Sequence, residues 1–189
     1  MKIGLYFGSF NPVHVGHLII AGYAAEQTDL DKVWLVVSPQ NPFKTENGLL
    51  NEYHRLHLVQ LAIDDDTRLR ASDVEFSLPR PSYTIDTLTY LREKYPQHEF
   101  ALVMGSDSLQ NLPRWKNGEQ IMREHDLYVY ERSAHPVSEN PGPRVKILKA
   151  PLLDISATAI RNNIRNGKSI RYLVPEQVRE EIERNRYYK

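Results

Sequence analysis

GSFNPVHVGH, residues 8–17, stands between a short apolar run at residues 3–7 and a helix-like segment at residues 18–25. A strand that ends in a turn with Gly8 and Pro12, and then enters a helix, has the layout of a nucleotide phosphate site. The turn lets the backbone approach a ligand closely, and the helix start offers unpaired N–H groups and a partial positive charge. This stretch therefore predicts the opening strand, phosphate-binding turn and helix of an α/β fold.

Two histidines occupy the start of the expected helix. His14 and His17 are three residues apart, so both imidazoles can point the same way and donate hydrogen bonds to one oligophosphate. Neutral imidazoles at this spacing could instead share a zinc ion, which needs a third ligand nearby. The turn contains no Cys or carboxylate, and Glu26 is more than two helical turns further on. A second pair, His54 and His57, is expected to be solvated on another helix.

Apolar and amphipathic segments alternate along the chain, which is typical of βαβ units. We expect helices at residues 16–28, 52–63, 84–95 and 119–124, and strands at residues 3–7, 32–38, 68–71, 100–104, 127–130 and 145–148. This order predicts an α/β fold with a Rossmann-like, doubly wound parallel sheet and helices on both faces. We expect one domain over residues 1–189, with a helical C-terminal part from about residue 155. Ligands of such folds bind beyond the carboxyl ends of the strands, at the topological switch point.

Composition limits the function classes. The 189 residues contain 24 Lys and Arg and 24 Asp and Glu, so no net field draws the protein to nucleic acid or to anionic lipid. Apolar runs such as residues 33–37 are too short to span a bilayer, and the N-terminus lacks the apolar core of a signal peptide. We therefore expect a cytoplasmic protein. The absence of Cys excludes disulfides, Cys-zinc sites and a thiol nucleophile.

Two long connections interrupt the regular pattern. Residues 39–50 follow an expected strand at the ligand edge and include Asn41 and Lys44, so we assign this loop to substrate binding. Residues 133–143 carry three Pro and one Gly and are expected to form a plain surface loop.

A second possible phosphate site lies near the C-terminus. The segment ISATAIR, residues 155–161, places two hydroxyls and a guanidinium at the start of a helix expected to run to about Asn166. Ser156 and Thr158 are natural N-caps, so helix formation alone could explain them. Arg161, about a turn and a half from Ser156, could join the free N–H groups in holding a phosphate.

Between these motifs lie SYTIDTL at residues 82–88, GSDSL at 105–109 and PRW at 113–115. The first is explained structurally by a helix N-terminus capped by Thr84, and the second by a glycine turn after a strand. Trp115 is different, because Arg114 and Lys116 flank it in a polar loop and the sequence offers no packing partner. An indole ring in such a place can stack on a flat heterocycle.

With these segments and SPQNPFK at residues 38–44, the chain resembles bacterial nicotinate-nucleotide adenylyltransferases over nearly its whole length. The resemblance implies that ATP and nicotinate mononucleotide form nicotinate adenine dinucleotide and pyrophosphate, in NAD synthesis, with Mg²⁺ held mainly by the ATP phosphates. Many members carry His-Lys or His-Arg where this chain has Phe43-Lys44. A cationic role can therefore be transferred to Lys44, and an imidazole role at residue 43 cannot.

The resemblance also implies which residues form the site. His14, His17 and Arg161 would be catalytic, neutralising the phosphates and the departing pyrophosphate. Trp115 would stack on the pyridine ring, and backbone N–H groups at residues 84, 85 and 116 would meet its carboxylate. The ATP site would contain Gly8, Ser9, Phe10, His14, Gly16, His17, Gly105, Asp107, Ile155, Ser156, Thr158 and Arg161. The mononucleotide site would contain Asn41, Lys44, Thr84, Ile85, Asp107, Trp115 and Lys116. No side chain is assigned to a metal.

Alternative functions remain open at this point. The chain could be an adenylyltransferase for nicotinamide mononucleotide, or for both mononucleotides. Phosphopantetheine is a further candidate substrate, although it offers no aromatic ring to stack. A nucleotide-binding sensor without turnover would need neither both imidazoles nor Arg161. The sequence leaves the oligomeric state open, including a homo-oligomer.

Overall fold

The computed structural model describes residues 1–40, 48–132, 135–137, 142–151 and 153–189. Its sheet has the order β3-β2-β1-β4-β5-β6, and every neighbouring pair of strands is parallel. The strands are β1 (Lys2–Gly8), β2 (Lys32–Val37), β3 (Leu69–Ser72), β4 (Glu99–Gly105), β5 (Leu127–Tyr130) and β6 (Val145–Leu148). The chain reverses direction across the sheet between β1 and β4, which makes their carboxyl ends the topological switch point.

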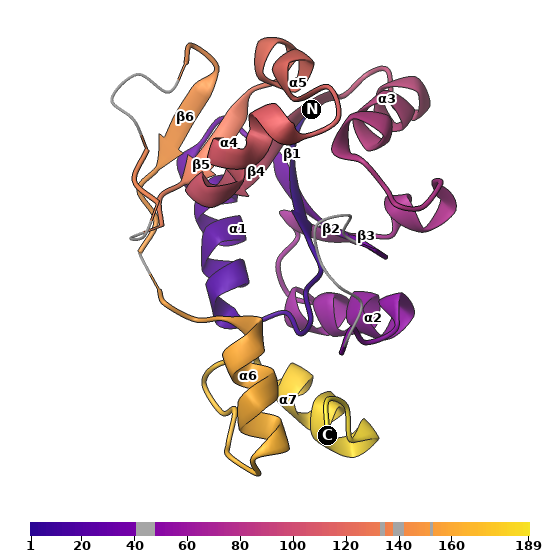
Figure 1. Cartoon of the computed structure of the whole chain (residues 1–189), viewed down its shortest axis with the longest axis vertical. Coiled ribbons are helices and arrows are strands. Elements are labelled where there is room, and N and C mark those ends of the chain that lie inside the picture. The colour runs from indigo at the N-terminus through magenta and orange to yellow at the C-terminus, as the bar shows by residue number, and fades with distance from the viewer. Residues whose placement is uncertain (41–47, 133–134, 138–141, 152) are drawn as a thin grey trace.

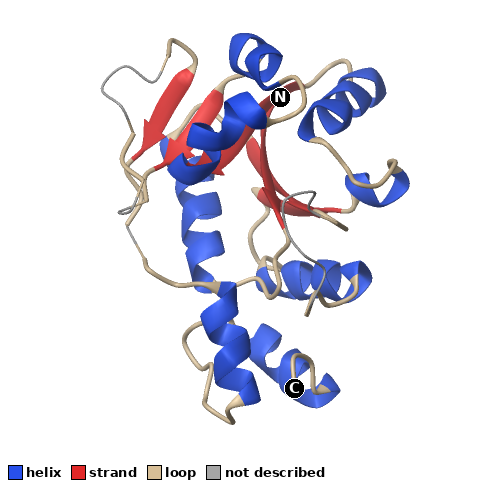
Figure 2. Ribbon diagram, viewed as in Figure 1, coloured by secondary structure: helices blue, strands red, loops and turns tan. Residues whose placement is uncertain are grey.

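Helices cover both faces of this sheet, as predicted (Figures 1 and 2). They are α1 (Val15–Gln27), α2 (Glu52–Ala62), α3 (Thr84–Lys94), α4 (Ser106–Asn111), α5 (Gly118–Glu124), α6 (Ala157–Arg165) and α7 (Glu176–Asn185). Two short 3-10 helices, η1 (Val74–Ser77) and η2 (Leu112–Arg114), join the regular elements. The doubly wound α/β architecture expected from the alternating pattern is therefore confirmed.

Strand residues alternate between two hydrophobic cores. In β1, Ile3 and Leu5 face the core formed with α3 and α5, whereas Tyr6 faces the core formed with α1, α2, α6 and α7. In β2, Trp34 and Leu35 divide in the same way. Strands buried on both faces read as continuous apolar runs, which explains why the sequence located them within one or two residues.

Four helical elements were not anticipated, one of them the three-residue η2. The helix α4 has six residues, SDSLQN, and looked like a turn because it contains one apolar side chain. The 3-10 helix η1 is similarly short. The longer α7, EQVREEIERN, buries only Val178 and Ile182, so its apolar pattern was too sparse to detect.

The C-terminal helices share a hydrophobic core with the sheet and α1. Ile160 of α6 and Val178 and Ile182 of α7 belong to the same buried cluster as the α1 side chains. The amide N–H of Val15 donates to the carbonyl oxygen of Leu173 over 3.0 Å. In Figure 1, α6 and α7 lie at the end of the molecule farthest from α5. The segment between α6 and α7 therefore supports the start of α1.

His54 and His57 are exposed, as expected for solvated side chains, but both also contact α7 or the residues after it. The His54 Nδ1 lies 3.0 Å from the Tyr187 hydroxyl, and the His57 Nε2 lies 3.7 Å from a Glu181 carboxylate oxygen. Their structural role is to join α2 to the C-terminal segment.

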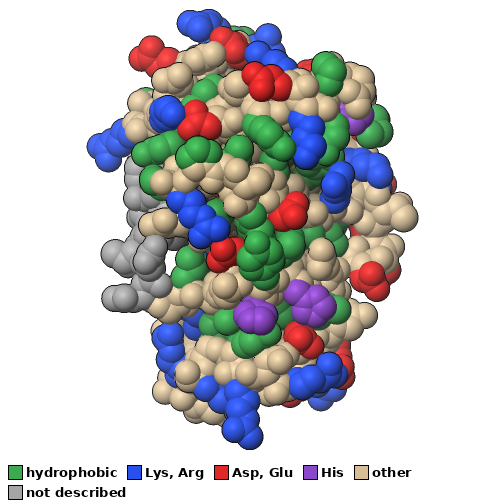
Figure 3. All heavy atoms as spheres, turned by 90° about the vertical axis from the view of Figure 1, so that its right-hand side faces the viewer, with side chains coloured by type: hydrophobic (Ala, Val, Ile, Leu, Met, Phe, Trp, Pro, Cys, Tyr) green, Lys and Arg blue, Asp and Glu red, His purple; other side chains and the backbone are tan. Residues whose placement is uncertain are grey.

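Charges of both signs are interspersed on the face shown in Figure 3, without a block of one sign. Among the described residues, no helix is both long and apolar enough to cross a membrane.

Candidate active site

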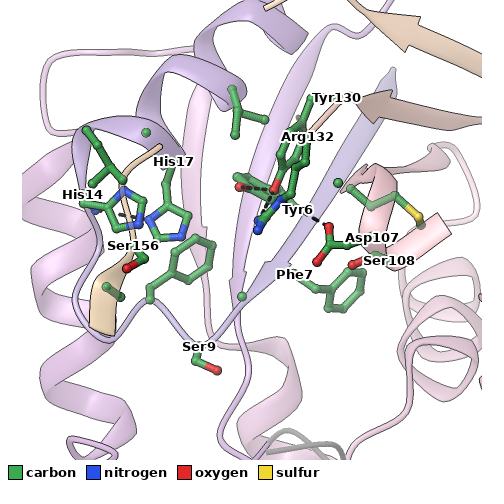
Figure 4. A pocket seen from close by; sticks show the side chains of 18 of the residues that line it. Tyr6, Phe7, Ser9, His14, His17, Asp107, Ser108, Tyr130, Arg132 and Ser156 are labelled. Atoms are coloured by element: carbon green, nitrogen blue, oxygen red, sulfur yellow. Dashed lines mark hydrogen bonds and ion pairs between the residues drawn. The ribbon is translucent and has the colours of Figure 1, made fainter. Parts of the chain in front are cut away.

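A cleft of about 820 Å³ opens at the carboxyl ends of β1 and β4. Figure 4 shows His14, His17 and Ser156 on one side, and Asp107, Ser108 and Arg132 on the other. All twelve residues predicted for the ATP site line this cleft: Gly8, Ser9, Phe10, His14, Gly16, His17, Gly105, Asp107, Ile155, Ser156, Thr158 and Arg161. The fold thus brings together motifs separated by about 150 residues in the chain, at the location expected for a switch-point site.

The turn after β1 is shaped by close packing of small and aromatic residues. A Cβ on Gly8 would lie 2.8 Å from the Phe10 ring, and a Cβ on Gly16 would lie 3.1 Å from the His14 ring. Phe10 adopts a left-handed backbone conformation, with φ of 44°, and its side chain is buried. A larger residue at either position would therefore press against a side chain of the turn itself, and the contact would be closer at Gly8.

The two histidines form a stacked pair. Their ring centroids are 3.7 Å apart, and the His14 backbone N–H donates to the His17 Nδ1 over 3.2 Å. Because Nδ1 of His17 is an acceptor, a neutral His17 carries its proton on Nε2. That nitrogen can donate to a ligand oxygen.

His14 is held in its neutral form. Burial, followed by the positive charge of Arg132, lowers the pKa of His14 from 6.5 to about 4. Among the described residues, its buried Nδ1 has no hydrogen-bond partner. An anion entering the cleft would offset both causes of the shift and favour protonation.

The helix α6 presents its N-terminus to the same cleft. Ser156 is its N-cap and accepts a hydrogen bond from the Ala159 N–H over 3.2 Å, so the capping role expected from the sequence is present. Arg161 donates to the backbone oxygen of Asn11 over 2.7 Å and lies 3.3 Å from the Thr158 hydroxyl. Arg161 thereby joins α6 to the turn that carries the histidines.

Asn11 was not selected from the sequence, although it connects several parts of the site. Its Nδ2 donates to the Gly48 carbonyl over 2.9 Å, and its Oδ1 accepts from the Leu50 N–H over 3.1 Å. Its own carbonyl receives Arg161. A short amide here fixes the turn against both α6 and residues 48–50.

Arg55 was also missed, because it lies in a helix segment that reads as polar surface. Its side chain is fully buried and donates to the carbonyl oxygens of Ser9, Ser38, Pro39 and Leu50 over 2.5–3.1 Å. Burial lowers the pKa of this guanidinium to about 10, which leaves it charged at neutral pH. Arg55 therefore holds the ends of β1 and β2 together by cationic hydrogen bonds to neutral acceptors.

The far wall of the cleft contains a cation that the sequence did not indicate. The Arg132 Nε lies 3.2 Å from an Asp107 carboxylate oxygen, and its Nη2 donates to the Tyr130 hydroxyl over 2.9 Å. A Cβ on Gly105 would lie 2.4 Å from the Asp107 carboxylate and 2.9 Å from the Arg132 Nε, so a larger residue at the end of β4 would displace this ion pair. Arg132 stands after β5 in an irregular segment, and no motif marked it.

A smaller pocket of about 120 Å³ adjoins the cleft and shares Gly8 and Trp115 with it. Thr84, Trp115 and Lys116 line this pocket, whereas the Ile85 side chain packs in the core. The Lys116 ammonium lies 2.8 Å from an Asp86 carboxylate oxygen. Thr84 is not the N-cap of α3, in contrast to the expectation: Tyr83 is, and it makes no side-chain cap. Asn41 and Lys44 lie outside the described residues.

No group of three His, Cys, Asp or Glu side chains in the described part of the chain is arranged to hold a metal ion. The structure thus offers His14 and His17 no third protein ligand for zinc among these residues.

The comparisons with known proteins agree with this geometry. The family described as cytidylyltransferase-like matches residues 5–163. A probable nicotinate-nucleotide adenylyltransferase of Cytophaga hutchinsonii is 57% identical, over 100% of this chain and 98% of the relative. The chain belongs to the nicotinate-nucleotide adenylyltransferase family. A probable nicotinate-nucleotide adenylyltransferase of Flavobacterium johnsoniae is 52% identical over the full length of both chains.

Solved structures share the fold of this adenylyltransferase family member. The nicotinic acid mononucleotide adenylyltransferase of Plasmodium falciparum, complexed with NaAD, superposes with a TM-score of 0.86 over 99% of this chain and 97% of that one. Its sequence identity is 21%, so this likeness supports the architecture and not individual residues.

Proposed function

We propose that the protein transfers the adenylyl group of ATP to nicotinate mononucleotide, giving nicotinate adenine dinucleotide and pyrophosphate in NAD synthesis. The observation that carries this proposal is the joined pair of cavities at the switch point. One cavity has stacked histidines and a helix N-terminus suited to phosphates, and the adjoining one has an indole beside a second helix N-terminus. Relatives of the same length at 52% and 57% identity support the assignment.

His14, His17 and Arg161 would contact the ATP phosphates. The Nε2 of His17 can donate a hydrogen bond, and His14 can accept a proton when the phosphate charge arrives. The hydroxyl of Thr158, the N–H groups at the start of α6 and Arg161 would hold the β- and γ-phosphates. Arg132 would add positive charge from the opposite wall.

The residues fit a magnesium ion that arrives with ATP. Mg²⁺ keeps several of its waters and binds through phosphates and few carboxylates, so it needs no cage of protein ligands. We assign the ion to phosphate oxygens and to no side chain. When bound, it would supply charge neutralisation on the triphosphate.

The mononucleotide would occupy the smaller pocket and the adjacent part of the cleft. Trp115 lines both cavities and would stack on the pyridine ring. Backbone N–H groups of Thr84, Ile85 and Lys116 would donate to the ring carboxylate. Asp107 would accept hydrogen bonds from sugar hydroxyls, and Asn41 and Lys44 remain proposed contacts outside the described residues.

The reaction needs no covalent enzyme intermediate. The 5′-phosphate oxygen of the mononucleotide forms the new bond to the α-phosphorus of ATP, and the bond from that phosphorus to the bridging oxygen breaks as pyrophosphate leaves. The protein's contribution is to align the two phosphates and to neutralise charge.

Kinetics with two mononucleotides test the proposal. A carboxylate only accepts hydrogen bonds, whereas a carboxamide would place its NH₂ against backbone donors. We expect pyrophosphate release with ATP and nicotinate mononucleotide, and a kcat/KM at least about a hundredfold above that for nicotinamide mononucleotide. Equal values would favour a dual-specificity enzyme. No release with either substrate would favour a nucleotide-binding sensor.

A further inference from the structure

Glu75 is a buried carboxylate in the wall of the smaller pocket, and the reaction described above gives it no role. Glu75 is 2% exposed and lines the smaller pocket. It lies in η1, which precedes the segment that leads into α3. Buried carboxylates are rare and costly, and they persist where they are hydrogen-bonded or serve a function.

The partners of Glu75 are hydroxyl groups on both sides of the α3 N-terminus. One carboxylate oxygen accepts from the Ser82 hydroxyl over 2.9 Å, and the other accepts from the Thr87 hydroxyl over 2.9 Å. Burial raises the pKa of the Glu75 carboxyl, and the hydroxyls of Ser38, Ser82 and Thr87 oppose this effect. The carboxylate thereby ties the end of β2 and the start of α3 to η1.

These contacts affect the helix N-terminus directly. Ser and Thr near a helix start commonly cap its first N–H groups. Here the N-cap is Tyr83, and its side chain makes no cap. The Ser82 hydroxyl, which precedes this N-cap, and the Thr87 hydroxyl, in the first turn of α3, are both held at Glu75. The Asp86 and Thr87 N–H groups already donate to the Tyr83 carbonyl oxygen, so the Thr84 and Ile85 N–H groups are the ones that can donate to a ligand in the pocket.

We infer that Glu75 is a positioning residue for substrate selection: its hydrogen bonds to Ser82 and Thr87 fix the start of α3 so that the first N–H groups of this helix donate to the carboxylate of the pyridine ring. This inference rests on the proposed function and deepens it. The charge of Glu75 is not the attracting element, since a negative group would repel another carboxylate. Its contribution is geometric, and so it should be expressed as selectivity.

The test compares Glu75→Ala with the wild type, with both nicotinate and nicotinamide mononucleotides as substrates. We expect the KM for nicotinate mononucleotide to rise about tenfold, the loss of one well-placed hydrogen bond, with the KM for ATP changed less than about twofold. Calorimetric titration of nicotinate mononucleotide without ATP should give the same loss in Kd. The preference for nicotinate over nicotinamide should fall by a similar factor.

Two further variants separate positioning from general destabilisation. Thr87→Val removes one hydroxyl and retains the shape, so it should reduce the preference in the same direction and provides a milder test where Glu75→Ala does not fold. Leu88→Ala is the control for lost stability, because it opens a cavity in the core on the buried side of α3. It should lower Tm and retain the preference for nicotinate over nicotinamide mononucleotide.

The outcomes distinguish the inference from the proposed function. A wild type that does not prefer nicotinate mononucleotide would overturn the proposed function. The role of Glu75 alone would be overturned by a different result. In that case the wild type prefers nicotinate mononucleotide, and both Glu75→Ala and Thr87→Val keep the same ratio of kcat/KM values within about twofold.

Discussion

Lowering the pH from about 7 to about 4.5 should destabilise the protein through His14, because the folded state keeps this imidazole neutral and the unfolded chain does not. The pKa of His14 is about 4 in the folded protein, against 6.5 for an unperturbed histidine. Between these values the unfolded state binds more protons, so the free energy of unfolding falls as the pH falls. Above pH 6.5 this contribution is fully present.

The size of the effect follows from the two pKa values. Each pKa unit corresponds to about 1.4 kcal/mol, so the difference between 6.5 and about 4 amounts to about 3 kcal/mol over the whole range. His14 is 6% exposed, which justifies counting most of this value. Carboxylates with lowered pKa values, such as Asp126 and Glu52, also lose stability in acid, so the His14 part must be obtained as a difference between variants.

Urea unfolding of the wild type and of His14→Gln, at several pH values, gives this difference. The glutamine is polar and cannot titrate, so the wild type should lose about 2 to 3 kcal/mol more than the variant between about pH 7 and about pH 4.5. Arg132→Gln removes the nearby positive charge that helps to lower the pKa of His14. It should therefore reduce the additional loss of unfolding free energy in acid. If the free energy of unfolding changes with pH equally in the wild type and in His14→Gln, the argument is refuted.

Four further substitutions test the site. His14→Ala or His17→Ala should lower kcat about a hundredfold and raise KM less, because each donor acts mainly on developing charge; folded variants with half the wild-type kcat would contradict this. Arg161→Lys retains the charge but loses the planar fork, so activity should fall; unchanged kcat and ATP KM would leave Arg161 as a helix-surface residue. Trp115→Ala should raise the KM for both mononucleotides, because stacking depends on the ring and not on its substituent; unchanged KM values would exclude stacking.

The sequence predicted those parts of the site that depend on local order. A strand, a glycine-containing turn and a helix start follow one another at residues 2–17, so the local structure of the proposed phosphate site could be predicted from spacing alone. The same holds for α6, where Ser156 caps the helix as expected.

The residues that sequence reasoning missed act through contacts between distant segments. Arg55 lies on a helix between two exposed histidines, and only the packing of α2 against the ends of β1 and β2 shows that it is buried. Arg132 becomes part of the site because β5 lies beside β4. Glu75 and Thr87 are 12 residues apart, and their hydrogen bond depends on the fold of the intervening loop.

The concentration of positive charge around the cleft has a consequence for the lifetime of the protein. Arg55, Arg132 and Arg161 lie in or behind the cleft, and Asp107 is within ion-pair distance of Arg132. In the proposed function the ATP triphosphate would give Arg132 and Arg161, which line the cleft, an anionic partner. Binding to the folded state alone stabilises it by mass action. Folded protein should therefore become scarcer, and proteolysis faster, when cellular ATP falls, which would link the capacity for NAD synthesis to energy supply without any dedicated regulatory site.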